Sequence, residues 1–262
     1  MTHRTNDLLT VALDGPVAVV TLLYGAGPDG LGRPHAEALV RTFHALNTDP
    51  SCRVIVLTGE GDFCPGGDFS GGADGAGDLL ALRGRLGTAT TLFRDIRRGP
   101  QPVIAAVEGK AFGAGLALVA ASDFVVAGEG ASFRSDALGA GLLPEGGLLW
   151  SLPEKIGDAK ARELMLLGRI MGADEARRCG LVSEIVPAGG ALGAALALAR
   201  RFESLPFVTV ALVKGALFNG AVTMADGERM ELDLNPLARQ AVDHLEAVAA
   251  FLEKRKPSFV GN

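Results

Sequence analysis

Residues 108–121, Glu-Gly-Lys-Ala-Phe-Gly-Ala-Gly-Leu-Ala-Leu-Val-Ala-Ala, join a predicted buried strand to a predicted buried helix through a glycine turn. The β-branched residues in 102–107 indicate the strand, and the Ala/Leu-rich run 114–121 indicates the helix. The glycines between them allow a sharp turn and close approach of a ligand to the main chain. Unpaired N–H groups at a helix start attract negative charge. The stretch is therefore a candidate oxyanion site, although plain packing alone also explains such a turn.

A second predicted buried strand also runs into a glycine-rich turn. Residues 53–58 read Arg-Val-Ile-Val-Leu-Thr, and residues 59–69 read Gly-Glu-Gly-Asp-Phe-Cys-Pro-Gly-Gly-Asp-Phe. Together the two turns resemble the crotonase superfamily, the enoyl-CoA hydratase/isomerase family. Its first signature is roughly Phe-Cys/Ser-x-Gly-x-Asp, and its second is Gly-x-x-x-Gly-Gly-Gly leading into a helix. The first match is close, and the second departs only at Ala114, which stands at the middle glycine.

Composition narrows the class of protein. The 262 residues are 48% hydrophobic and 21% charged, which excludes general disorder and predicts one large domain or one domain with a small appendage. A net charge of −5 without a long basic run argues against a nucleic-acid partner. No apolar run is long enough for a membrane span, and the polar start lacks a signal-peptide core. We therefore expect a soluble cytoplasmic protein.

The cysteines give no sign of a metal site or a nucleophile. Cys52, Cys64 and Cys179 are odd in number and lack metal-ligand spacing, which favours a reducing compartment. Cys64 lies in the first signature, but no histidine is placed by the sequence to activate it. We expect no bound metal.

The remaining pattern predicts an α/β fold. A hairpin is expected over 9–13 and 17–23, with further strands at 123–126, 131–133 and 181–186. Helices are expected over 36–46, 78–98, 158–167, 173–179, 191–205, 208–219 and 236–255. The resemblance implies a crotonase-type spiral of repeated ββα units with a C-terminal helical module. We place the spiral core, with the acyl-CoA site, at residues 1–189 and the helical oligomerisation module at 190–262.

The resemblance also implies how a ligand is held. In the family, two main-chain N–H groups donate hydrogen bonds to the oxygen of an acyl thioester, and by position these donors are Gly67 and Ala114 here. Alanine keeps the donor because the N–H belongs to the backbone. Deprotonation beside a thioester, or hydration of an α,β-unsaturated one, places negative charge on that oxygen, which two donors stabilise. The implied ligand is an acyl-CoA thioester, with CoA as part of the substrate and no other cofactor.

Proton transfer also needs a carboxylate. Family hydratases carry two glutamates, and Ala117 and Ala137 stand at those positions here. Hydration by two carboxylates therefore requires Asp136, one residue away, to be presented in a shifted register. Some related double-bond isomerases and an aryl-CoA dehalogenase place an acid where Glu145 stands. We expect Glu145 to be the catalytic base, although a first-turn residue favoured by the helix dipole is the structural alternative.

A single base favours shuttling one proton between two carbons, so double-bond isomerisation is the leading expectation. Flanking residues Leu142, Leu143, Leu148 and Leu149 are expected to desolvate Glu145 and raise its pKa. Two alternatives stay open. One is a hydratase or another specialised acyl-CoA reaction aided by Asp136 or His35, and the other is a catalytically silent acyl-CoA-binding homologue.

Further residues are expected near the substrate. Residues 70–77 are low in complexity and predict a surface loop or a flap over a ligand. The resemblance implies a homotrimer or a dimer of trimers, in which the chain's C-terminal end reaches a neighbour's CoA. Trp150 is expected in the core, and Asp68 is expected to cap a helix. The expected substrate-binding residues are Gly66, Asp68, Phe69, His35, Asp136, Phe251 and Lys254.

Overall fold

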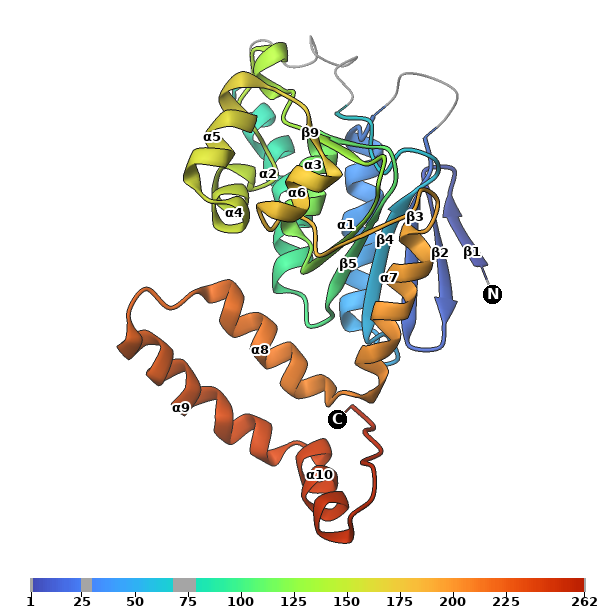
Figure 1. The fold of residues 1–262 in the computed structure, drawn as a ribbon, viewed down its shortest axis with the longest axis vertical. Coiled ribbons are helices and arrows are strands. Elements are labelled where there is room, and N and C mark those ends of the chain that lie inside the picture. The colour runs from blue at the N-terminus through green and yellow to red at the C-terminus, as the bar shows by residue number, and fades with distance from the viewer. Residues whose placement is uncertain (1, 25–29, 68–78, 262) are drawn as a thin grey trace.

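The structure is a computed structural model that describes residues 2–24, 30–67 and 79–261 (Figure 1). Within these residues the main sheet has seven strands in the order β1-β2-β3-β4-β5-β7-β10. The first three strands pair antiparallel, and the remaining pairs are parallel. The strands are β1 (Thr2–Asn6), β2 (Leu9–Asp14), β3 (Val17–Leu22), β4 (Val54–Gly59), β5 (Val103–Val107), β7 (Phe124–Gly128) and β10 (Glu184–Val186). The predicted hairpin and the predicted α/β class are confirmed.

A second sheet of three strands completes the strand system of the described residues. It consists of β6 (Lys110–Phe112), β8 (Ser132–Arg134) and β9 (Met171–Gly172) in that order. The chain passes from β5 in the main sheet to β6 in the second sheet and then enters α3 (Ala114–Ala121). It repeats the crossing from β7 to β8 before the 3-10 turn η1 (Ala137–Ala140) and α4 (Leu148–Ile156). This repetition confirms the predicted spiral of ββα units.

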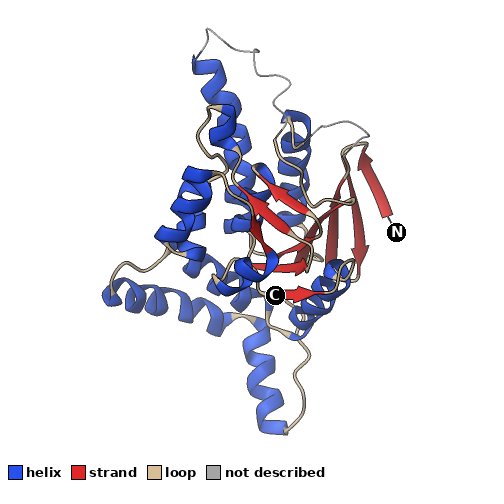
Figure 2. Cartoon of the chain, turned by 45° about the horizontal axis from the view of Figure 1, so that its top comes forward, coloured by secondary structure: helices blue, strands red, loops and turns tan. Residues whose placement is uncertain are grey.

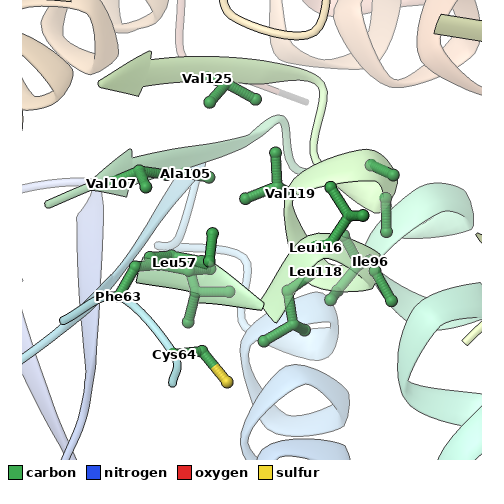
Figure 3. Packing of buried hydrophobic residues seen from close by; sticks show 14 of the residues in the cluster. Leu57, Phe63, Cys64, Ile96, Ala105, Val107, Leu116, Leu118, Val119 and Val125 are labelled. Carbon is green, nitrogen blue, oxygen red and sulfur yellow. The ribbon is translucent and has the colours of Figure 1, made fainter. Parts of the chain in front are cut away.

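The larger core lies between the sheets and the first helices, α1 (Arg33–Thr48), α2 (Leu79–Arg98) and α3. Figure 3 shows strand residues such as Leu57 and Val107 facing Leu116 and Val119 of α3. All seven residues of α3 after Ala114 are buried, which explains its almost uniformly apolar sequence. Each fully buried large apolar side chain contributes roughly 1.5–3 kcal/mol. The core therefore fixes α3, and with it the turn that precedes α3.

The opposite face of the main sheet is covered by α7 (Ala191–Arg200) (Figure 1). Its buried alanines Ala191, Ala195 and Ala199 recur every fourth residue and pack on valines and Ile104 of the sheet. The Glu108 carboxylate accepts a hydrogen bond of 3.0 Å from the N–H of Ala191 and so caps this helix. The division of the chain at residue 189 stays a prediction.

The C-terminal helices extend away from the sheets (Figures 1 and 2). The one helix predicted over 236–255 is wrong, because the described chain forms two helices with a break at Ala241. The first of them begins at Met224, where Thr223 and Asp226 form a capping box. Pro236 lies inside it. The remaining helical elements are α5 (Asp158–Leu167), α6 (Ala173–Arg178), η2 (Arg201–Ser204), α8 (Phe207–Asn219), α9 (Met224–Gln240) and α10 (Val242–Glu253).

Several large apolar side chains are exposed. In α2, Leu92 and Phe93 are buried, but Leu79 is 79% exposed and Leu86 is 41% exposed. Trp150 is 49% exposed, so its prediction as a core residue is wrong. It packs instead against the guanidinium of Arg97. In the part of the chain that the structure describes, no helix is both long and apolar enough to cross a bilayer.

Candidate active site

Main-chain hydrogen bonds hold the two glycine turns against each other. The N–H of Cys64 donates to the carbonyl of Lys110 at 2.8 Å, and the N–H of Phe112 donates back to the carbonyl of Cys64 at 3.0 Å. A further N–H, that of Leu31, donates to the carbonyl of Gly66 at 2.8 Å. The turn after β4 and the turn before α3 are therefore fixed side by side, as the two motifs predict.

Glycines permit this close approach. Gly113 has φ 47°, a left-handed conformation that disfavours side chains, and its N–H donates to the carbonyl of Arg134 at 2.9 Å. A Cβ atom at Gly115 would lie only 2.7 Å from the Cβ atom of Cys64. Cys64 itself is buried, and burial raises the pKa of its thiol. The cysteine is thus a packing residue beneath the turn.

The two predicted donors, Gly67 and Ala114, lie at the ends of these turns. Both residues are partly exposed, whereas their neighbours Gly66 and Gly115 are buried. Among the described residues, neither the N–H of Gly67 nor that of Ala114 donates a hydrogen bond to the protein. Ala114 is the first residue of α3, where intrahelical acceptors are missing. Both N–H groups are therefore available to an external acceptor.

Asp136 lies beside both turns. A Cβ atom at Gly66 would be 3.1 Å from its Oδ2 atom, and one at Gly113 would overlap its Oδ1 atom. Oδ1 is buried and has no hydrogen-bond partner among the described residues. Oδ2 lies 3.7 Å from Nη2 of Arg134, whose guanidinium covers the ring of Phe112 at 4.3 Å. The structure thus places one carboxylate against the residues that precede both predicted donors.

Glu145 occupies the neighbouring segment between η1 and α4. Its side chain is exposed, yet partial desolvation still raises the pKa of its carboxyl. A Cβ atom at the next residue, Gly146, would lie 2.6 Å from the ring of Phe93 and 2.8 Å from the Cβ atom of Ala117. The segment that carries Glu145 therefore packs directly on α3 at Ala117.

The expected leucine shell around Glu145 forms only in part. Leu148 is 2% exposed, but Leu142, Leu143 and Leu149 are 46%, 72% and 57% exposed. The prediction that all four are positioned to desolvate the carboxyl is wrong, because three of them face solvent in the turn between η1 and α4.

His35 is a packed residue of α1. It is 7% exposed, its ring stacks on Tyr24 with 5.6 Å between centroids, and its Nε2 atom lies 2.9 Å from the carbonyl oxygen of Leu23. The predicted contact of His35 with substrate stays a prediction.

Other predicted site residues lie elsewhere. Phe251 is on α10 and Lys254 is its C-cap residue, in the part of the chain that extends away from the sheets (Figure 1). Both are exposed. Asp68, Phe69 and the loop 70–77 lie outside the described residues.

Sequence reasoning missed Arg134. Its pairing with Phe112 follows from the parallel register of β8 and β6, which neither strand reveals alone. The alternation of Arg134, Ser135 and Asp136 was the available signal, because it brings the two charged residues close together. Among the described residues, no three His, Cys, Asp or Glu side chains gather into a metal-binding group.

Known proteins resemble this chain over nearly its whole length. The family model described as enoyl-CoA hydratase/isomerase matches residues 15–262. A 1,2-epoxyphenylacetyl-CoA isomerase of Escherichia coli is 33% identical, over 87% of this chain and 88% of that protein. A crotonyl-CoA hydratase of Syntrophomonas wolfei is 35% identical, over 82% of this chain and 84% of that protein. The solved structure of an enoyl-CoA hydratase from Polaromonas superposes with a TM-score of 0.88 at 32% identity. The match covers 96% of this chain and 99% of the solved one.

Proposed function

Because the chain belongs to the enoyl-CoA hydratase/isomerase family, we propose that it moves a double bond along the acyl chain of a CoA thioester. Glu145 removes a proton from C2 or C4, and the same carboxyl returns it to the other carbon. The negative charge of the intermediate enolate rests on the thioester oxygen. The observation that carries the proposal is that Glu145, whose carboxyl has a raised pKa, lies on a segment packed against α3.

Gly67 and Ala114 are the proposed oxyanion donors. Neither N–H group donates a hydrogen bond within the described chain, and main-chain hydrogen bonds join the two turns, which supports this role. A donor that is already oriented needs no reorganisation when charge develops, and each contributes on the order of 3 kcal/mol to the transition state. These donors bind the oxygen, whereas proton movement requires the nearby carboxylate.

Glu145 suits the role of base for a physical reason. The resemblance implies that family hydratases carry one of their two glutamates at the position of Ala117. Gly146, the residue after Glu145, packs on that alanine. Glu145 therefore supplies a carboxylate from the neighbouring segment. Its raised pKa makes it a better proton acceptor than an ordinary surface glutamate.

Hydration of an enoyl-CoA is the second candidate function, and Asp136 favours it. Its buried Oδ1 atom, which has no hydrogen-bond partner in the described part of the chain, lies beside Gly113, which precedes the donor Ala114. Asp136 and Glu145 would then replace the two glutamates of other hydratases, one activating water and the other donating a proton. The crotonyl-CoA hydratase among the relatives agrees with this alternative.

Incubation with 2-enoyl-CoA and 3-enoyl-CoA in deuterated water distinguishes the two reactions. Isomerisation predicts interconversion of the two substrates without a hydroxylated product. Hydration predicts 3-hydroxyacyl-CoA from the 2-enoyl substrate. Failure of both reactions, with binding retained, would contradict both proposals and favour a catalytically silent acyl-CoA-binding protein.

Matched variants assign the carboxylates. We expect Glu145→Gln to lower turnover about 10³-fold with little change in binding of the substrate. Asp136→Asn should lower turnover similarly only if hydration by two acids is the reaction. Glu129→Gln is the control, because Glu129 is exposed on the turn after β7. Unchanged turnover in Glu145→Gln would remove Glu145 from the mechanism.

We also propose that the enzyme acts as a homotrimer or a dimer of trimers. Phe251 and Lys254 would then contact the adenine and the 3′-phosphate of the CoA bound by a neighbouring copy. Their exposure on α10 and at its end supports this role, because it leaves both side chains free to meet a second chain.

A further inference from the structure

A second site candidate is a cavity of about 190 Å³ at the far end of α3 from Ala114. It lies where the ends of α2, α3 and α4 meet α8 (Figure 1). The eight residues of α3 rise about 12 Å, so the cavity is separate from the glycine turns. Its polar lining consists of Arg97, Ser122, Asp123, Lys155 and Lys214.

Lys214 and Asp123 satisfy each other. Nζ of Lys214 donates to Oδ2 of Asp123 at 2.7 Å and to the carbonyls of Ile96 and Gln101 at 2.8 and 2.6 Å. The three protons of this ammonium are therefore used. Oδ2 of Asp123 also accepts the N–H of Val103 at 2.7 Å. The same carboxylate also attracts Arg97 and Lys155, so its single negative charge is shared among three cations.

Lys155 and Arg97 keep unused donors. Nζ of Lys155 donates to the carbonyl of Ser122 at 2.6 Å, which leaves two of its three protons without an acceptor among the described residues. Nη1 of Arg97 donates to the carbonyl of Ala120 at 3.2 Å. The buried Nε of Arg97 has no acceptor among the described residues. The guanidinium lies 4.4 Å from the ring centroid of Trp150, which fixes its plane.

The charges around the cavity do not balance. Three cations face one carboxylate and the C-terminal ends of α2, α3 and α4, each of which carries about half a negative charge, so the cations still exceed the anions. Glu154, which also attracts Arg97, is exposed to solvent. Desolvation lowers the pKa of Lys155 to about 8 and also lowers the pKa of Arg97 and Lys214. A bound anion would relieve this excess of positive charge.

We propose that this cavity binds a phosphate group through Lys155 and Arg97. A phosphate oxygen accepts hydrogen bonds from both an ammonium and a guanidinium. Its negative charge matches the cationic excess left after Asp123 pairs with Lys214. The cavity volume is large enough for one tetrahedral anion and accompanying water. This site lies apart from the proposed oxyanion donors, and its phosphate comes either from free phosphate or from the 3′-phosphate of coenzyme A.

Calorimetric titration of the full-length protein with inorganic phosphate, at constant ionic strength, tests the proposal. We expect saturable binding that weakens at least tenfold in Lys155→Gln and in Arg97→Gln. Arg162→Gln is the control, because it removes the same charge from an exposed ion pair on α5. Absence of saturation, or equal binding by the wild type and both cavity variants, overturns the proposal.

A measurement on the unchanged protein keeps the test valid if either variant fails to fold. Bound phosphate stabilises the ammonium of Lys155, so binding at pH 8 should take up protons, detected as a heat that depends on the ionisation enthalpy of the buffer. Binding without proton uptake would contradict a contact with Lys155. Displacement by coenzyme A but not by dephospho-coenzyme A would identify the 3′-phosphate as the ligand, and displacement by neither would identify a free phosphate.

Discussion

At the scale of single residues, Gly113 links the backbone of the site to its carboxylate. We expect Gly113→Ala to cost about 2–4 kcal/mol of stability, because it combines a left-handed φ of 47° with overlap of the new Cβ and Oδ1 of Asp136. Gly147→Ala is the matched control, since Gly147 has φ 73° but nothing within 4 Å of an added Cβ. Chemical denaturation measures both. Equal losses would show that overlap with Asp136 has no effect.

The raised pKa of Glu145 predicts a pH dependence of the reaction. A base must be ionised to accept a proton, so turnover should fall as the pH drops through the pKa of Glu145. Because partial desolvation raises this pKa above 4.5, the acidic limb of the kcat profile should have its midpoint above 4.5. The limb should disappear from the residual activity of Glu145→Gln. A midpoint at or below 4.5 would contradict the assignment.

The two glycine motifs of the sequence predicted which residues are the candidate oxyanion donors. Gly67 and Ala114 were placed by short motifs, because the turns depend on glycines that are adjacent in sequence. The position of Asp136 between Gly66 and Gly113 required the structure, since it depends on β8 pairing with β6 across the second sheet. The exposure of Glu145 depends on the path of the chain through Gly146 and Gly147. Contacts between residues that are distant in the sequence are therefore hard to predict from the sequence alone.

At the scale of elements, Lys214 anchors α8 to the rest of the protein. It is 7% exposed and donates to main-chain carbonyls at the end of α2 and to Asp123. Lys214→Met should destabilise the protein by about 3–5 kcal/mol, because it leaves a carboxylate and two carbonyls without their donor. Lys256→Met is the control, since Lys256 is exposed near the C-terminus. Thermal unfolding tests this prediction. Equal melting temperatures of Lys214→Met and Lys256→Met would show that Lys214 does not hold α8 in place.

Replacing Lys155 should stabilise the protein, in contrast to the destabilisation expected when Lys214 is replaced. Its pKa in the folded state is lowered from 10.5 to about 8, so its charged form is disfavoured by folding. The penalty is complete below pH 8 and disappears as the pH rises from 8 to 10.5, since the folded state then loses its proton first. Lys155→Met should therefore be more stable than the wild type at pH 7 by about 1 kcal/mol, after allowance for water and the lost hydrogen bond to Ser122.

Denaturation in phosphate-free buffer at pH 7 and pH 10 measures this difference. The advantage of Lys155→Met should shrink at pH 10, while Lys256→Met should follow the wild type at both values. An advantage that grows with pH would show that burial does not depress the pKa of Lys155.

Helices and strands were predicted best where local signals agree. The helix at 114–121 has the predicted bounds, because a glycine turn precedes it and its residues are uniformly apolar. The sequence predicts a helix that begins at Pro236, because proline is also typical of a first helical position, whereas α9 begins at Met224. The capping box of Thr223 and Asp226 was the stronger signal. Tertiary packing then tolerates the proline inside α9 despite its missing N–H.

At the scale of the whole molecule, the described chain leaves a broad apolar surface on its C-terminal helices. Large side chains of α8, α9 and α10 are exposed, whereas the central strands β4 and β5 and the helix α3 are buried. An exposed apolar surface of this kind is typical of an interface between chains. The exposed residues are Leu217, Leu232, Leu237, Leu245, Val248, Phe251 and Leu252.

Association through this surface predicts the mass of the particle in solution. Sedimentation equilibrium should give three or six copies of the 27.0 kDa chain. Leu245→Asp should lower that mass, because it places a charge on a 63% exposed leucine of α10 that we expect to be buried between copies. Lys254→Gln should keep the assembly but weaken CoA binding, since the residue is proposed to contact the 3′-phosphate. A monomeric wild-type chain with full activity would contradict both the assembly and the role of the neighbouring copy in binding CoA.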